Sequence, residues 1–155
     1  QGFKDYFSIQ KSDRLPAMFG FQAAGAAPIV DGEPVANPET VATAIRIGNP
    51  ASWQGAKTAI QESKGFIDKV EDEEILHAYK FVAKTEGLFV EPASAVPLAG
   101  LIRCAKENRI PSGSVITASM TGHGLKDPDT AINNVGFSPI VVKPELDEVL
   151  KTMGL

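Results

Sequence analysis

The sequence predicts an α/β layered domain in which helices cover both faces of a parallel sheet. Short apolar runs of strand length alternate along the chain with longer segments whose apolar residues recur at helical spacing. Strands separated by helices of this length pair in parallel through crossovers. With 155 residues and 43% hydrophobic side chains, the chain is long enough to form one domain with a core.

Four helices are expected, each from an apolar stripe and from signals at its ends. They cover residues 52–65, 72–86, 92–105 and 144–154. Ser52 offers an N-cap oxygen to the first of them. The second begins with acidic residues, which the positive amino end of the helix dipole stabilises. In the last, Pro144 suits the first turn and Gly154 suits a left-handed stop.

Strands are expected in the apolar runs that lie between these helices. The runs are residues 65–70, 87–90, 114–120 and 138–142. The stretch 31–38 is rich in proline and glycine and is expected to be a loop.

Composition and motifs exclude several classes of function. The chain has 15 basic and 19 acidic residues without a basic cluster, which argues against nucleic-acid binding. A single cysteine, Cys104, allows no disulfide framework and no Cys/His metal spacing, so a reducing cytoplasm is expected. Apolar stretches such as 23–30 are too short to span a bilayer. The usual hydrolase, zinc-protease and P-loop motifs are absent.

The segment Thr121-Gly122-His123-Gly124 is the first candidate site, because it follows a predicted strand and ligands bind at the carboxyl ends of parallel strands. Its glycines allow a close backbone approach or a positive φ, and the Thr121 hydroxyl both donates and accepts hydrogen bonds. The alternative interpretation is a turn that ends a strand and carries a solvated histidine.

Two other segments offer weaker candidates. Glu91 ends the run 87–90 and either orients a ligand or caps the following helix. The Gly48-Asn49-Pro50 turn either offers backbone amides to an anion or is a plain turn. The small residues from 19 to 28 favour close packing of a helix on a sheet. His77 falls one position off its helix stripe, which predicts a surface or boundary histidine.

Taken together, four segments resemble the pyridoxal-phosphate-dependent threonine synthases. They are GFQAAGAAP at 20–28, TAIRIGNPASW at 43–53, EPASA at 91–95 and TGHGLKDP at 121–128. The resemblance implies a fold similar to tryptophan synthase β, with two α/β domains and pyridoxal 5'-phosphate between them. It implies that residues 1–155 are the carboxyl-terminal part of the catalytic region.

The resemblance also implies roles for individual residues. Thr121 would face the pyridine nitrogen of the cofactor, where a neutral hydroxyl can bond an uncharged nitrogen without enforcing its protonation. Gly48 would lie beside the ring, Glu91 would stand behind the pyridine end, and Gly122 and Gly124 would shape the loop. The implied reaction converts O-phospho-L-homoserine and water to L-threonine and phosphate.

The same family places its Schiff-base lysine and its phosphate-binding glycine loop in a segment that does not match this sequence. Lys69 and Lys126 lie in segments that match other positions of the family and not its lysine motif. We therefore expect no catalytic residue in this chain. The chain opens at Gln1 without a methionine, and we expect a fragment that is inactive without its amino-terminal partner segment. A homodimer is implied by the resemblance.

The alternatives to a threonine synthase are a threonine or serine dehydratase of the same fold and a non-catalytic ligand-binding α/β module.

Overall fold

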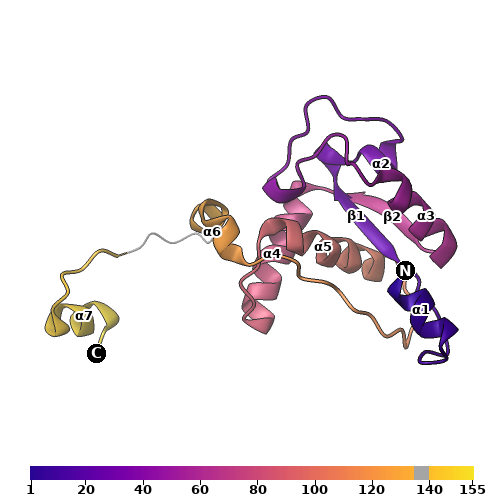
Figure 1. The fold of residues 1–155 in the computed structure, drawn as a ribbon. Coiled ribbons are helices and arrows are strands. Elements are labelled where there is room, and N and C mark those ends of the chain that lie inside the picture. Colours follow the sequence, from indigo (N-terminus) through magenta and orange to yellow (C-terminus); the bar gives the residue numbers. More distant parts are fainter. Residues whose placement is uncertain (135–139) are drawn as a thin grey trace.

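The fold is taken from a computed structural model that describes residues 1–134 and 140–155 (Figure 1). The helices are α1 (Gly2–Ser8), α2 (Pro28–Asp31), α3 (Trp53–Ser63), α4 (Asp72–Glu86), α5 (Pro92–Lys106), α6 (Pro128–Asn134) and α7 (Leu146–Met153). The strands are β1 (Phe19–Ala23) and β2 (Phe66–Val70), and the short 3₁₀ helices are η1 (Ala24–Ala26), η2 (Thr43–Ile45) and η3 (Gly124–Lys126).

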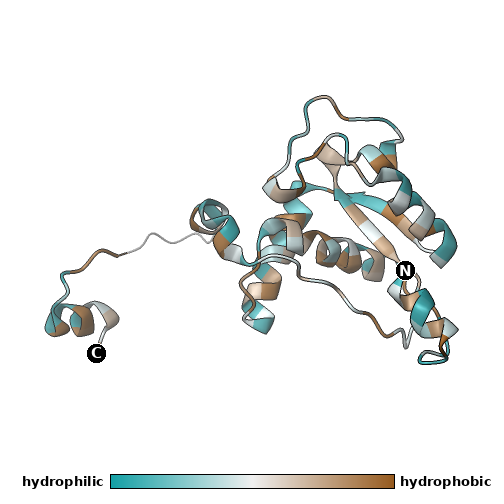
Figure 2. Cartoon of the chain, in the orientation of Figure 1, coloured by the Kyte–Doolittle hydropathy of each residue, from teal (hydrophilic) through white to brown (hydrophobic). Residues whose placement is uncertain are grey.

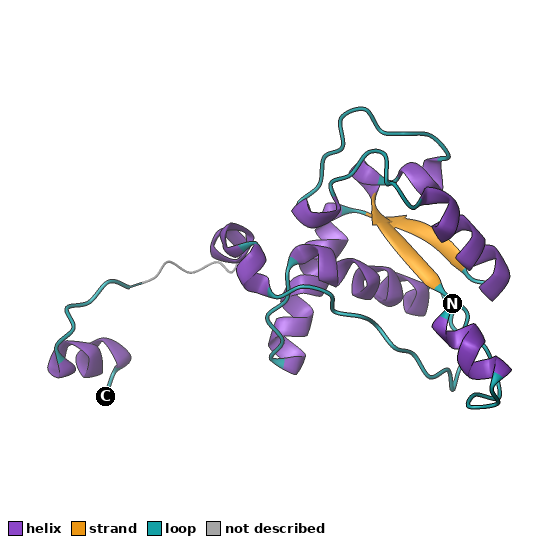
Figure 3. Ribbon diagram, in the orientation of Figure 1, coloured by secondary structure: helices purple, strands orange, loops and turns teal. Residues whose placement is uncertain are grey.

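The two strands form a parallel sheet that lies between two layers of helix. The pairing runs from Phe19 opposite Phe66 to Ala23 opposite Val70. Helix α5 packs against both strands, whereas α2 and α3 contact β2 (Figures 1 and 3). The predicted α/β fold with helices on both faces of a parallel sheet is therefore confirmed.

The core lies where α4 and α5 pack against each other and against the sheet. Its fully or nearly fully buried members are Ala23, Ala42, Val70, Ile75, Ala78, Tyr79, Val82, Val90, Ala95, Val96 and Ala99. Figure 2 shows α5 as a mainly hydrophobic helix at the centre of the molecule. Gly100 of α5 is buried, and a Cβ at this position would overlap the ring of Phe21. The close approach of α5 to β1 therefore depends on a residue without a side chain.

The four predicted helices correspond to α3, α4, α5 and α7, because the signals that define them are local. At the start of α4, the Glu71 amide donates to Glu74 Oε2 at 2.9 Å, which completes a capping box. Gly154 ends α7 with φ of 75°, as the left-handed stop predicts. The expected cap at Ser52 is wrong in one respect: Ser52 occupies the N-cap position of α3, but its hydroxyl makes no capping bond.

Of the predicted strands, only 65–70 is confirmed, as β2. The run 87–90 contributes a single antiparallel bridge, from Val90 to His123. The run 114–120 is irregular, with Val115 99% exposed. Residues 138 and 139 lie outside the described part of the chain, and 140–142 form no strand. A strand requires a partner edge, and within the described residues these runs find no pairing beyond the single bridge at Val90.

Four helices and strands that the sequence did not predict are β1, α1, α2 and α6. The small residues within β1 predict close packing and do not by themselves predict a strand. Neither α1 nor α6 contains a buried residue, so neither has an apolar stripe facing the core. Among the described residues, no helix has the length and apolar character that crossing a membrane requires.

Candidate functional site

The segment 121–124 lies against the chain that leads into α5. Backbone contacts join the two segments: the Glu91 amide donates to Gly122 O and the Gly124 amide donates to Phe89 O, both at 3.0 Å, and Val90 bridges His123. Two of the four segments that carry the family resemblance are therefore in direct contact. These contacts fix the backbone that directly follows Thr121.

Ser94 connects the first turn of α5 to Thr121. Its side chain is buried, and its Oγ accepts a hydrogen bond from the Gly122 amide at 2.8 Å. The same oxygen lies 3.2 Å from Thr121 Oγ1 and 3.3 Å from Gly122 O. Thr121 itself is exposed, so its hydroxyl is held from behind by Ser94 and is accessible from outside. Sequence reasoning assigned no role to Ser94.

Glu91 is buried beside the same loop and is paired with Lys126. Its side chain is 5% exposed, and its Oε1 lies 2.8 Å from the Nζ of Lys126, which is 58% exposed. A Cβ at Gly122 would lie 3.0 Å from Glu91 Cγ and closer still to the carboxylate. Gly122 therefore permits the loop to pass directly over this carboxylate, at a negative φ rather than a positive one.

Gly124 and His123 complete the turn. A Cβ at Gly124 would lie 2.5 Å from Cζ of the Phe89 ring, so the second glycine is also required for close contact. His123 is exposed, and its Nδ1 accepts a hydrogen bond from the Leu125 amide at 3.2 Å. The His123 ring meets Phe89 edge to face, with centroids 5.5 Å apart. His123 stabilises the turn, and the expected shaping of the loop by the two glycines is confirmed.

We expect Lys126→Met to lower the free energy of unfolding by about 1–3 kcal/mol, because it leaves the buried Glu91 carboxylate without its charged partner. Urea unfolding of the full-length gene product carrying this sequence measures the change. Adding Glu91→Gln should recover part of the loss, because the amide carries no charge. Lys80→Met, at an exposed position of α4, is the control and should change stability by no more than about 0.5 kcal/mol. Equal losses in the single and double variants would contradict the pairing.

Gly48 is held by contacts outside the Thr121 loop. Its carbonyl accepts from the Val35 amide at 2.9 Å, and a Cβ at Gly48 would lie 3.0 Å from the Val35 carbonyl carbon. This turn therefore packs against the proline-rich loop. Within residues 1–134 and 140–155, no hydrogen bond joins Gly48 to the Thr121 segment.

The segment 43–53 nevertheless reaches the candidate site through its first residue. Thr43 Oγ1 lies 3.2 Å from Asp127 Oδ2, just beyond the Thr121 loop. The preceding residues are anchored on α4, because Thr40 Oγ1 donates to Asp72 Oδ1 at 2.6 Å. Three of the four family segments are therefore connected by hydrogen bonds, and Gly48 lies in the middle of the segment 43–53, five residues after Thr43.

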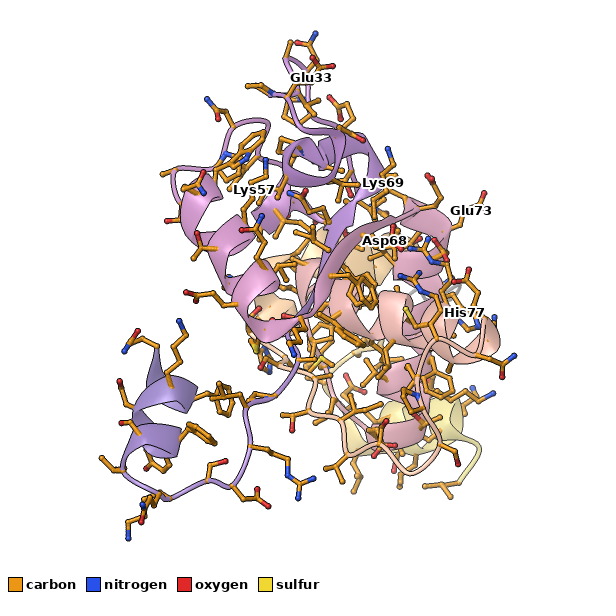
Figure 4. The ribbon with its side chains drawn as sticks, turned by 90° about the vertical axis from the view of Figure 1, so that its right-hand side faces the viewer. Glu33, Lys57, Asp68, Lys69, Glu73 and His77 are labelled. Atoms are coloured by element: carbon orange, nitrogen blue, oxygen red, sulfur yellow. The ribbon has the colours of Figure 1, made fainter. Side chains whose placement is uncertain are left out.

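Lys69 and Cys104 have the side-chain types of nucleophiles, but their surroundings oppose that role. A hydrogen bond with Asp31, at 2.7 Å, raises the pKa of Lys69, so this lysine is held in its charged form (Figure 4). Cys104 is fully buried, and burial raises the pKa of its thiol.

The charged cluster around Asp68 is structural. Burial tends to raise the pKa of Asp68, but hydrogen bonds from Arg109 and the Lys69 amide, with the charge of Arg103, bring the pKa below its usual value. These ion pairs join β2 to α5 and to the residues that follow it. His77, labelled in Figure 4, is exposed on α4, which confirms the predicted surface position. The described residues contain no group of side chains arranged to hold a metal ion.

Comparison with known proteins connects these segments to a family. The model of the family described as "Pyridoxal-phosphate dependent enzyme" matches residues 1–122. Threonine synthase from Synechocystis sp. is 50% identical over 154 residues, which cover 99% of this chain and 40% of that protein. Threonine synthase from Mycobacterium tuberculosis is 51% identical over 156 residues, covering 100% of this chain and 43% of the relative. The chain thus spans about two fifths of the length of these relatives.

Among solved structures, a fungal L-serine ammonia-lyase from Rhizomucor miehei aligns with 83% of this chain and 44% of its own. The TM-score is 0.51 and the identity is 17%, so this likeness concerns the fold alone. The family match extends over most of the chain and covers the sheet, both core helices, Glu91, Ser94 and Thr121. This chain belongs to the pyridoxal-phosphate dependent enzymes.

Proposed function

We propose that this chain is the carboxyl-terminal part of a threonine synthase, which converts O-phospho-L-homoserine and water to L-threonine and phosphate. The observation that carries the proposal is an identity of 50–51% with threonine synthases along essentially the whole chain. The four segments quoted from the sequence lie within this aligned region. The proposal includes an amino-terminal partner segment that supplies the Schiff-base lysine and the phosphate loop.

The donor set at the Thr121 loop fits the pyridine end of pyridoxal 5'-phosphate. Thr121 presents an exposed neutral hydroxyl, and its backbone is fixed by the contacts of the loop with residues 89–91. A hydroxyl suits a ring nitrogen because it can donate to an unprotonated nitrogen or accept from a protonated one. When bound, the cofactor supplies an electron sink for the carbanions that the reaction requires.

In this proposal, the residues of this chain bind and orient the cofactor. Thr121 holds the ring nitrogen, and the buried pair of Glu91 and Lys126 supports the loop from behind. Gly48 is proposed to lie beside the ring through its backbone, because the position that a Cβ would take is occupied by the Val35 carbonyl. The cytoplasmic location and the homodimer that the sequence and the resemblance imply stay predictions.

The test is a product assay on the full-length gene product with pyridoxal 5'-phosphate. We expect O-phospho-L-homoserine to yield L-threonine and inorganic phosphate in equal amounts, measured by amino-acid analysis and phosphate release. The 155-residue chain alone, assayed in the same way, should release no phosphate.

Two other outcomes would overturn the assignment. Production of a 2-oxo acid and ammonia from threonine or serine, without turnover of the phosphorylated substrate, would identify a dehydratase. Tight binding of an amino acid in the absence of cofactor and of catalysis would indicate a ligand-binding module.

A further inference from the structure

The hydroxyl of Ser94 has more neighbours than its single proton can serve. A serine oxygen carries one proton and two lone pairs. One lone pair accepts from the Gly122 amide at 2.8 Å. The proton then has two acceptors within reach, Thr121 Oγ1 at 3.2 Å and Gly122 O at 3.3 Å. The choice between them decides what the Thr121 hydroxyl can do.

Two arrangements of the protons are possible at this junction. If Ser94 donates to Thr121 Oγ1, the proton of Thr121 is free and points outward as a donor. If Thr121 instead donates to Ser94, Ser94 donates to Gly122 O and Thr121 presents only a lone pair outward. The first arrangement suits an unprotonated ring nitrogen, and the second suits a protonated one.

The surroundings favour the first arrangement. Gly122 O already accepts a hydrogen bond from the Glu91 amide at 3.0 Å. Within the described part of the chain, the hydroxyl of Thr121 has no hydrogen-bond partner other than Ser94. Ser94 is 1% exposed, so no bulk water competes for its proton. Donation to Thr121 therefore directs the Ser94 proton to an oxygen that accepts no other hydrogen bond from the described residues, and it leaves the Thr121 proton free to point outward.

We propose that Ser94 is a positioning residue that fixes the direction of the Thr121 proton, so that Thr121 donates to an unprotonated ring nitrogen of the cofactor. This inference rests on the proposed function, because it requires the cofactor ring to stand in front of Thr121. Ser94 contacts neither cofactor nor substrate in this account. Its effect passes entirely through the hydroxyl of Thr121.

The test uses the full-length gene product loaded with pyridoxal 5'-phosphate that carries ¹⁵N in its ring. The ¹⁵N chemical shift, followed against pH, reports the protonation of the ring nitrogen directly. In the unmodified protein we expect the shift of an unprotonated, hydrogen-bonded nitrogen at neutral pH. In Ser94→Ala, the midpoint of the titration should move upward by about one pH unit, which is a tenfold larger ratio of protonated to unprotonated nitrogen at a given pH.

Further variants separate positioning from a merely structural role. In a Thr121→Val background, Ser94→Ala should cause no additional shift of the titration, because Ser94 acts only through Thr121. Ser94→Cys carries a weaker hydrogen-bond donor and should give an intermediate shift of the titration. If Ser94→Ala does not retain the cofactor, Ser94→Cys takes its place in the test. Ser114→Ala removes an exposed hydroxyl that bonds only to Pro111 O within the described residues, and it should leave the titration unchanged.

An unchanged titration in both Ser94→Ala and Ser94→Cys, with normal turnover by the unmodified protein, would overturn the role of Ser94 and leave the proposed function intact. Absence of bound ¹⁵N cofactor in the unmodified protein, together with no turnover of O-phospho-L-homoserine, would instead overturn the proposed function.

Discussion

Replacing Gly65 with alanine is expected to lower the free energy of unfolding by about 3 kcal/mol or more. Gly65 directly precedes β2, and a Cβ there would lie 2.7 Å from the Met18 carbonyl carbon and 2.9 Å from the Met18 nitrogen. Met18 directly precedes β1. Because the obstructing atoms are backbone, no side chain can rotate away, and the strands must separate where Phe19 pairs with Phe66.

Urea unfolding of the full-length gene product measures this loss, and Gly55→Ala is the matched control. Gly55 lies in α3, and a Cβ at this position would meet no neighbouring atom within 4 Å, so alanine should raise stability by about 0.5–1 kcal/mol. A loss below about 1 kcal/mol in Gly65→Ala would show that the two chain segments do not approach so closely.

The helices were predictable because their determinants lie within the helices themselves. The acidic start of α4 and its stop at Gly87, with φ of 67°, are visible in any reading of residues 71–87. The same holds for α7, whose end at Gly154 follows a complete apolar stripe. Local signals of this kind do not depend on where the rest of the chain lies.

The strands were less predictable because a strand depends on its partner. Residues 114–120 have the composition of a strand, but they lie in an irregular, largely exposed segment. Conversely, Phe19–Ala23 looked like a packing segment, although Phe19, Phe21 and Ala23 recur at the spacing of a strand. Its pairing with β2 joins residues 47 positions apart in every register pair, a relationship that local pattern does not contain.

The candidate site, like the fold, was predictable from the sequence only in part. The four segments with family resemblance directed attention to Thr121 and Glu91, and the structure joins their loops by backbone hydrogen bonds. The importance of Ser94 depends on distances to Thr121 and Gly122, which are 27 and 28 positions away. A serine in the first turn of a helix gives no sequence signal for such a contact.

The second large effect is expected for Thr121→Val in the full-length gene product. Valine keeps the shape of threonine but removes the hydroxyl, so we expect kcat to fall by about 10–100-fold, equivalent to the loss of one hydrogen bond of 1–3 kcal/mol. Cofactor should still bind, because the proposed lysine and phosphate loop are unchanged. Thr121 is exposed, so stability should change by less than about 1 kcal/mol.

Two controls accompany this variant. Thr121→Ser retains the hydroxyl and should keep most of the activity. Thr117→Val makes the same chemical change at an exposed position four residues upstream and should leave kcat unaltered. Turnover by Thr121→Val equal to that of the unmodified protein would remove Thr121 from its proposed role.

The central claim is that Thr121 faces the ring nitrogen of pyridoxal 5'-phosphate. A crystal structure of the full-length gene product with bound cofactor tests it directly. We expect Thr121 Oγ1 to lie about 2.7–3.2 Å from the ring nitrogen, with Ser94 Oγ behind it. A structure in which another residue contacts that nitrogen, or in which the Thr121 hydroxyl lies beyond hydrogen-bonding distance of the ring, would contradict the account.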